Sequence, residues 1–281
     1  MPSETQAAGP APKGGDLIRR HRLSTRIWHW LNAVTLLVML MSGLMIFNAH
    51  PRLYWGQYGA NNDPGWLEIG STNGGRGVLL IGSRSFDTTG VLGLSTGANG
   101  QPVEVAFPGW ATVPSTYDLA LARRWHLTFA WLLSASIVAY LLWSLVNGHL
   151  RRDLAPKGRE LRPGHIFHEI AQHARLRLPK GEAARHYNTL QKFSYLAVIL
   201  VLIPLMVLTG LTMSPQMDAA WPWLLDVFGG RQSARSIHFI TAWLLVGFVI
   251  VHLLMVLLAG PLNEIRSMIT GWFRLPKERA R

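Results

Sequence analysis

The chain has 281 residues, of which 49% are hydrophobic, and it carries 12 tryptophans, no cysteine and a formal net charge of +12. Without cysteine it cannot form disulfides, thiolate-ligated iron–sulfur clusters or covalent CxxCH haem attachments, so any cofactor must be held by other side chains. Four apolar runs, each about the twenty residues needed to cross a bilayer, exclude a soluble protein and predict a polytopic membrane protein. These runs cover residues 27–47, 127–147, 193–213 and 237–258.

The N-terminal segment, residues 1–20, is polar and rich in Ala, Pro and Gly, which predicts a disordered tail. The apolar run that follows it is longer than a signal-peptide core and lacks an obvious small-residue cleavage site. This run is therefore expected to stay in the protein as a signal anchor.

The distribution of Lys and Arg predicts the topology. Five lie in residues 1–26, nine in 148–189 and five after residue 260, but only five lie in the 77 residues of 48–124 and two in 214–235. The positive-inside rule then places both termini and the 148–189 loop in the cytoplasm and the other two loops outside a bacterial inner membrane. A nucleic-acid-binding protein would keep its basic residues in one block, so nucleic acid is not expected as a partner.

The outer loop, residues 48–124, is rich in Gly, Pro and aromatic residues. Within "VLGLSTGANGQPVEVAFPGW" an Asn99-Gly100 pair separates two apolar stretches, which predicts a β-hairpin. The loop composition favours a folded structure over a simple tether, although anchoring of Trp and Tyr at the membrane surface explains the aromatic residues equally well.

Three further features come later in the chain. The cytoplasmic loop holds five histidines without a metal-ligand spacing, which indicates a solvated surface, and a short amphipathic helix is expected near 166–176. Pro204 should kink the third span. Residues 261–281 form a basic cytoplasmic tail, and an interfacial helix is expected in its last segment, "ITGWFRLPKERAR", residues 269–281.

Four histidines lie in or beside the apolar runs. His238 and His252 are fourteen residues apart, close to four helical turns, so their rings point to nearly the same side of one helix about 21 Å apart. The predicted topology puts His29 at the inner level with His252, and His126 at the outer level with His238. The four histidines therefore form two pairs stacked across one bilayer.

Two imidazoles on facing helices suit a haem b, whose six-coordinate iron takes one axial nitrogen from each side. Taken singly, each histidine could instead be a hydrogen-bonded packing residue or part of a proton relay in a haem-free transporter. The absence of acidic residues from the four runs weakens the relay hypothesis, and a zinc site would want more ligands at each level.

The residues around these histidines match a known family. The matching segments are, in chain order, "RIWHWLNAVTLLVMLMSGL", "RRWHLTFAW", "HYNTLQKFSYL", "VLTGLTMSP" and "SIHFITAWLLVGFVIVHLL". Together they resemble the di-haem cytochrome b subunits of the cytochrome b561-like superfamily, found with formate dehydrogenase, thiosulfate reductase and hydrogenase. The resemblance implies an all-α membrane protein whose residues 21–260 form a four-transmembrane-helix bundle.

The resemblance also implies the site residues and cofactors. Two haem b groups would take His29, His126, His238 and His252 as axial ligands. A quinone, ubiquinone or menaquinone, would bind at "HYNTLQK", where Asn188 and Gln191 would hydrogen-bond a carbonyl, with Tyr187 nearby and Lys192 stabilising a semiquinone anion. The alternative for Asn188 and Gln191 is an N-cap with a first-turn polar partner at the start of the third span.

The segment "FNAHPRLYWG" looks like a variant associated with a periplasmic molybdopterin oxidoreductase, and His50 within it is expected to be structural rather than a third haem ligand. The predicted function is electron transfer between this periplasmic partner and the quinone pool. An electron-transfer subunit of an oxidoreductase complex, surrounded by membrane lipid, is favoured over an independent catalyst. The alternative is a stand-alone b561-type oxidoreductase acting on quinone and on superoxide or ferric ion. The direction of electron flow is left open.

Overall fold

The computed structural model describes residues 15–60, 62–97, 99–148, 150–174 and 188–275. The chain divides into two compact units. Unit 1 comprises Met1–His29, Ser144–Leu196 and Phe248–Arg281, and unit 2 comprises Trp30–Trp143 and Ala197–Gly247.

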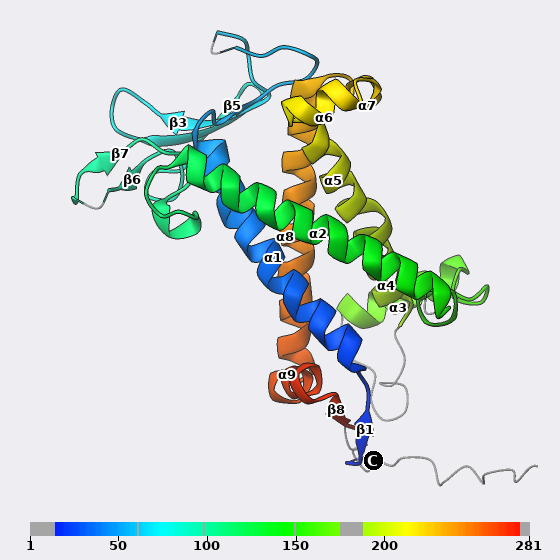
Figure 1. Cartoon of the computed structure of the whole chain (residues 1–281). Coiled ribbons are helices and arrows are strands. Elements are labelled where there is room, and N and C mark those ends of the chain that lie inside the picture. The colour runs from blue at the N-terminus through cyan, green and yellow to red at the C-terminus, as the bar shows by residue number, and fades with distance from the viewer. Residues whose placement is uncertain (1–14, 61, 98, 149, 175–187, 276–281) are drawn as a thin grey trace, which may run out of the picture. The chain divides into compact units, whose positions relative to one another are not determined.

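Four helices are long and apolar enough to cross a membrane (Figure 1). They are α1 (Leu23–Asn48), α2 (Leu119–Val146), the composite helix Thr189–Thr212 and α8 (Arg231–Ala259). In the most apolar window of each, at most 33% of the residues are buried, as expected for side chains that face lipid. The predicted class, an all-α membrane protein with four spans, is confirmed; α2 begins eight residues before the predicted 127.

The third span is interrupted ahead of its proline. It consists of α4 (Thr189–Ala197), the π-helical turn η4 (Val198–Leu202) and α5 (Ile203–Thr212), with Pro204 in the first turn of α5. Proline has no N–H to donate to the carbonyl one turn earlier, so an ordinary α-helical ladder cannot continue through this point. The expected distortion at Pro204 therefore takes the form of a π turn.

In unit 2 the loop after α1 is folded. Four antiparallel strands lie in the order β2-β3-β4-β5, and the hairpin predicted at Asn99-Gly100 is present as β6 paired with β7. The four-stranded sheet was not predicted. The strands are β2 (Arg52–Leu53), β3 (Leu67–Ser71), β4 (Gly77–Ile81), β5 (Arg84–Asp87), β6 (Ser95–Thr96) and β7 (Pro102–Val103).

A small apolar core joins this loop to the helix ends of unit 2. Its buried members are Phe47, Leu53, Leu67, Ile69, Ala106 and Phe107. Asn48 at the end of α1 hydrogen-bonds both the N–H and the carbonyl of Phe107, at 2.8 and 3.0 Å. Ser236 of α8 accepts from the Trp66 indole at 2.9 Å and donates to the Tyr54 carbonyl at 2.6 Å. Three short helices complete the unit: η1 (Gly109–Ala111), α6 (Pro215–Ala220) and α7 (Trp223–Val227).

Unit 1 contains a short two-stranded sheet, in which β1 (Leu17–Arg19) pairs antiparallel with β8 (Trp272–Arg274). The expectation of a disordered tail over residues 1–20 is therefore wrong for Leu17–Arg19, because β8 supplies the backbone partners of this segment. The helix of the C-terminal tail, α9 (Pro261–Thr270), lies earlier than expected. Within the described part of 269–281, residues 272–274 form β8 instead, because they pair with β1. The 148–189 loop holds the π-helical turn η2 (Leu150–Leu154) and the expected amphipathic helix, α3 (Pro163–Ala174).

Candidate functional site

The four histidines of the spans meet in two pairs, one in each unit. In unit 2 the His126 ring of α2 and the His238 ring of α8 have centres 6.3 Å apart and planes inclined by 62°. In unit 1 the His29 ring of α1 and the His252 ring of α8 also have centres 6.3 Å apart, with planes inclined by 53°.

This separation fits two axial ligands on one metal ion. A metal–imidazole bond is about 2.0–2.1 Å long, and the nitrogen lies about 1.1 Å from its ring centre, so two rings on opposite sides of one ion would have centres roughly 6.2 Å apart. Rings in direct van der Waals contact could lie closer. Both pairs thus have the spacing of a bis-imidazole site.

The hydrogen bonds of His126 determine which ring nitrogen carries its proton. Its Nδ1 lies 3.1 Å from the Met39 carbonyl and 3.1 Å from the Ser42 hydroxyl oxygen. A carbonyl only accepts, so Nδ1 must hold the proton and donate it. Ser42 in turn donates its hydroxyl hydrogen to the Val38 carbonyl at 2.7 Å, so it too can accept from the ring. The lone pair of neutral His126 is therefore on Nε2.

His238 is held in the same way by a different helix. Its Nδ1 lies 2.9 Å from the Thr209 hydroxyl oxygen of α5. Thr209 donates its own hydrogen to the Leu205 carbonyl at 2.6 Å, so it accepts from the ring. The two rings of this pair consequently both keep the proton on Nδ1 and the lone pair on Nε2, the arrangement that metal-ligating histidines use.

Each of these hydroxyl residues is followed by a glycine that faces the same ring. A Cβ added at Gly43 would lie 3.3 Å from Cε1 of His126, and one added at Gly210 would lie 3.6 Å from Cε1 of His238. The dipeptides Ser42-Gly43 and Thr209-Gly210 thus have the same role, one beside each ring. The hydroxyl orients the ring, and the missing side chain lets the ring approach the helix.

The His29–His252 pair has different neighbours. The His252 ring stacks on Phe248, one turn earlier on α8, with centres 6.1 Å apart and planes inclined by 18°. Phe248 meets the edge of Tyr195 at 6.5 Å. Among the described residues, the His252 ring makes no hydrogen bond, so its orientation depends on aromatic packing.

Comparison with known proteins agrees with this geometry. The family model described as prokaryotic cytochrome b561 matches residues 20–271. The chain belongs to the prokaryotic cytochrome b561 family. It is a multi-pass membrane electron-transfer protein, and family membership implies that it binds haem b. The two histidine pairs fit that cofactor, because each presents two imidazoles at bis-axial spacing.

Three curated relatives are similar to this cytochrome. It is 27% identical over 246 residues to the "Putative protein-methionine-sulfoxide reductase subunit YedZ1" of Azospira oryzae, covering 88% of this chain and 93% of the relative. It is 24% identical to the "Probable Ni/Fe-hydrogenase B-type cytochrome subunit" of Azotobacter vinelandii and 23% identical to that of Azotobacter chroococcum, covering 65% of this chain and 79% of each relative. No solved structure matches significantly.

The segment expected to bind quinone in this cytochrome begins with a capping box. The Asn188 side-chain oxygen accepts from the Gln191 N–H at 2.8 Å, and the Gln191 side-chain oxygen accepts from the Asn188 N–H at 3.3 Å. This is the N-cap arrangement considered as the alternative for these two residues, and it starts α4. The box uses the two amide oxygens as acceptors. Tyr187 lies outside the described residues.

Lys192 in the next turn is buried and is paired with a residue that the sequence analysis missed. Its ammonium lies 2.8 and 2.9 Å from the two carboxylate oxygens of Glu160. Burial opposes ionisation of Glu160, but the hydrogen bonds from Lys192 and from the Lys157 backbone outweigh it and lower the pKa of the carboxyl group. The only signal in the sequence was an acid within the basic segment "KGRELR".

His50, in the loop after α1, packs against Tyr54 and not against a histidine of the spans. Its ring stacks on Tyr54 with centres 5.7 Å apart, and its carbonyl accepts from the Arg235 guanidinium at 2.5 Å. Burial, followed by the positive charges of Arg235 and Arg52, lowers the pKa of His50. These contacts favour the structural role expected for this residue.

The histidines of the 148–189 loop do not gather into a metal site in the part of the chain that the structure describes, where no group of three or more His, Cys, Asp or Glu is arranged to hold a metal ion. His165 hydrogen-bonds the Thr189 hydroxyl at 3.0 Å and so helps to fix the start of α4. His149 and His186 lie outside the described residues.

Proposed function

We propose that this cytochrome passes electrons across the bacterial inner membrane between a periplasmic oxidoreductase and the quinone pool. One haem b would be held by His126 and His238, and a second by His29 and His252. The observation that carries the proposal is the equal 6.3 Å ring separation of the two pairs. Because His238 and His252 share α8, the two ligand sets lie at different depths along one helix.

The membrane orientation rests on the positive-inside rule. The Lys- and Arg-rich segments 1–26, 148–189 and 261–281 would face the cytoplasm, and the folded loop 48–124 would face the periplasm. In this orientation the His29–His252 pair lies toward the cytoplasm and the His126–His238 pair toward the periplasm.

Bound haem supplies a one-electron carrier, and the chain supplies ligands, orientation and a dry environment. Ser42 and Thr209 keep the Nδ1 protons of His126 and His238 in place, so that Nε2 can ligate iron. The apolar side chains of the spans keep water away from both sites.

The quinone would bind beside the His29–His252 pair, where the start of α4 belongs to the same unit. The amide NH₂ groups of Asn188 and Gln191 would donate to a quinone carbonyl, with Tyr187 nearby. An ammonium has three N–H donors, so the two contacts of Lys192 with Glu160 leave one for a quinone oxygen. Glu160 neutralises Lys192 when the site is empty and so makes its burial tolerable.

The partner would be an oxidoreductase subunit of the molybdopterin type that docks on the periplasmic loop. The relatives are named as subunits associated with a methionine-sulfoxide reductase and with hydrogenases, which supports an oxidoreductase partner for this chain as well. The folded sheet and hairpin of residues 52–103 offer a structured surface for such a partner.

The test is the reduced-minus-oxidised visible spectrum of the detergent-purified protein, with haem quantified per chain as the pyridine haemochrome. We expect two haems b per chain, both reduced by a quinol without any partner. One haem per chain, or none in protein made with haem available, would overturn the assignment of the two pairs. Turnover with superoxide or ferric ion as fast as with quinol, again without a partner, would favour the stand-alone oxidoreductase.

A further inference from the structure

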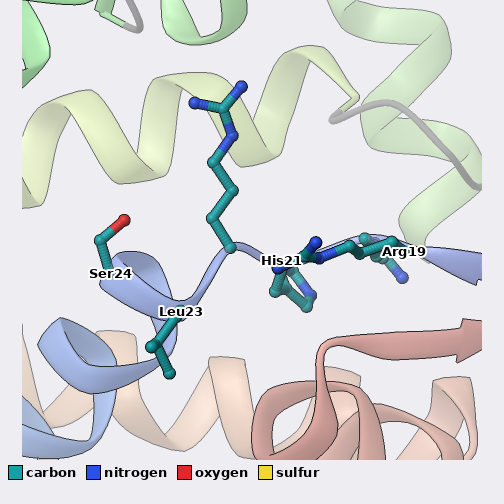
Figure 2. Close-up of a pocket in the computed structure, with 6 residues that line it drawn as sticks. Arg19, His21, Leu23 and Ser24 are labelled. Atoms are coloured by element: carbon teal, nitrogen blue, oxygen red, sulfur yellow. The ribbon is translucent and has the colours of Figure 1, made fainter.

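A pocket lies where β1 meets α1, at the end of a membrane-spanning helix in unit 1. Its volume is about 470 Å³, and it is lined by six consecutive residues, Arg19 to Ser24. Figure 2 shows Arg19 at the end of β1, His21 in the link to the helix, and Leu23 and Ser24 on the first turn of α1. Nothing in the proposed electron-transfer function uses this pocket.

Two of the three arginines in the pocket carry a positive charge that no described acidic residue neutralises. Of its three arginines, Arg20 is paired: its Nη1 lies 3.5 Å from a carboxylate oxygen of Glu264, and its Cζ lies 4.4 Å from the centre of the Phe273 ring. Arg19 and Arg22 are exposed, and neither forms an ion pair within the described residues. Burial and the neighbouring Arg20 lower the pKa of His21 to about 4, so His21 is neutral and the charge belongs to the arginines. The pocket therefore favours an anionic ligand.

Apolar surface borders the pocket on the side of the span. Leu23 is 56% exposed and Ile27, one turn further along the same face of α1, is 59% exposed. On the other strand, Trp272 is the register partner of Arg19 and is 48% exposed. An inorganic anion would make no favourable contact with these apolar side chains, whereas the acyl chain of a lipid would pack against them.

The neighbouring helix α9 has the pattern of a helix that lies in the membrane surface. Its exposed apolar side chains are Leu262, Ile265 and Ile269, spaced at i, i+3 and i+7 on one face. A helix of this kind buries its apolar face at the boundary between headgroups and acyl chains. The pocket then lies at the depth of the lipid headgroups, because β8 directly follows α9 and pairs with β1.

We propose that this pocket binds the headgroup phosphate of an anionic phospholipid. Arg19 and Arg22 hold the phosphate, the first turn of α1 adds its unpaired N–H groups, and the acyl chains run along Leu23 and Ile27. The same phosphate chemistry could come from free phosphate, so the experiment has to separate the two sources.

The experiment measures lipid binding to the full-length, detergent-purified protein by native mass spectrometry. The probes are dioleoyl phosphatidylglycerol, dioleoyl phosphatidylcholine and inorganic phosphate. The test variant is Arg19→Gln/Arg22→Gln. Because the whole chain carries a charge of +12, the matched control is Arg76→Gln/Arg84→Gln, which removes the same charge from exposed arginines of the extramembrane sheet.

We expect wild type and the control to bind one phosphatidylglycerol at least tenfold more tightly than phosphatidylcholine. The test variant should lose about fivefold in affinity for phosphatidylglycerol per arginine removed. Equal losses in the test and control variants would show a non-specific charge effect and overturn the proposal. Competition by millimolar inorganic phosphate at an affinity equal to that of the lipid would assign the pocket to free phosphate and overturn the lipid assignment.

Discussion

The two histidine pairs have the same ring separation but are held by different interactions. His126 and His238 each donate Nδ1–H to a hydroxyl group that is itself bonded to a helix carbonyl, and each ring faces a glycine. His252 stacks on Phe248 instead. The helices therefore set the ring spacing, whereas the residues around each ring set its tautomer and its freedom to turn. If each pair holds a haem as proposed, we expect the haem of the His126–His238 pair to be held more tightly than that of the His29–His252 pair.

The largest effect should come from removing a ligand. His238→Ala should reduce the haem content from two to one per chain by emptying the site of unit 2, and His252→Ala should do the same in unit 1, because among the described residues no third His, Cys, Asp or Glu joins either pair. Pyridine haemochrome assays and reduced spectra measure this. His168→Ala, on the exposed face of α3, should keep both haems. If His126→Ala and His252→Ala removed the same haem, the pairing would be wrong.

The hydroxyl groups should matter to one pair only. Thr209→Val removes the hydroxyl that accepts from the His238 Nδ1–H and should weaken haem retention by the His126–His238 pair about 10–100-fold, the usual cost of losing such a partner. Ser42→Ala should have a smaller effect, because the Met39 carbonyl still accepts from the His126 Nδ1–H. The His29–His252 haem should be unaffected. Haem transfer to apomyoglobin measures the retention. Thr241→Val is the matched control, since the buried Thr241 hydroxyl donates to the Ile237 carbonyl of its own helix. Equal haem loss in the control would contradict this role.

Disrupting the Lys192–Glu160 ion pair should affect unit 1, which contains the His29–His252 pair, and leave the His126–His238 pair unchanged. Lys192→Met leaves the Glu160 carboxylate without its cation and should cost about 2 kcal/mol, between the values for exposed and buried pairs. Thermal unfolding in detergent measures the loss, and quinol reduction should slow while the spectrum of the His126–His238 haem is unchanged. The double variant Lys192→Met/Glu160→Gln should recover part of the stability. No recovery would mean that Lys192 acts through packing alone.

The smallest effects are expected from replacing the two glycines that face the rings, and the two replacements should differ. Gly43→Ala places a Cβ 3.3 Å from the His126 ring, tighter than ordinary contact, and should cost about 1 kcal/mol by moving that ring. Gly210→Ala places a Cβ at 3.6 Å, an ordinary contact, and should be close to neutral. The electron paramagnetic resonance spectrum of the oxidised protein reports ring orientation. A larger change for Gly210→Ala would show that the two rings are not held as described.

Much of the fold follows from local sequence. The spans are recognisable because twenty apolar residues have few alternatives to a membrane helix. The hairpin at Asn99-Gly100 was found from its turn residues alone. The β2–β5 sheet was missed, although Thr72 to Gly75 has turn composition, because its strands are short and their pairing, such as Leu67 with Ile81, is a long-range choice.

The membrane class, the four spans and the four histidines at matching depths can be predicted from the sequence, since span length, charge distribution and helical periodicity are properties of the chain read in order. The side chains that surround each ring are known only from the folded chain. Ser42 meets His126 across 84 residues, and Glu160 meets Lys192 across 32. Such contacts depend on how helices rotate and pack against one another, and the pattern along a single helix does not contain that information.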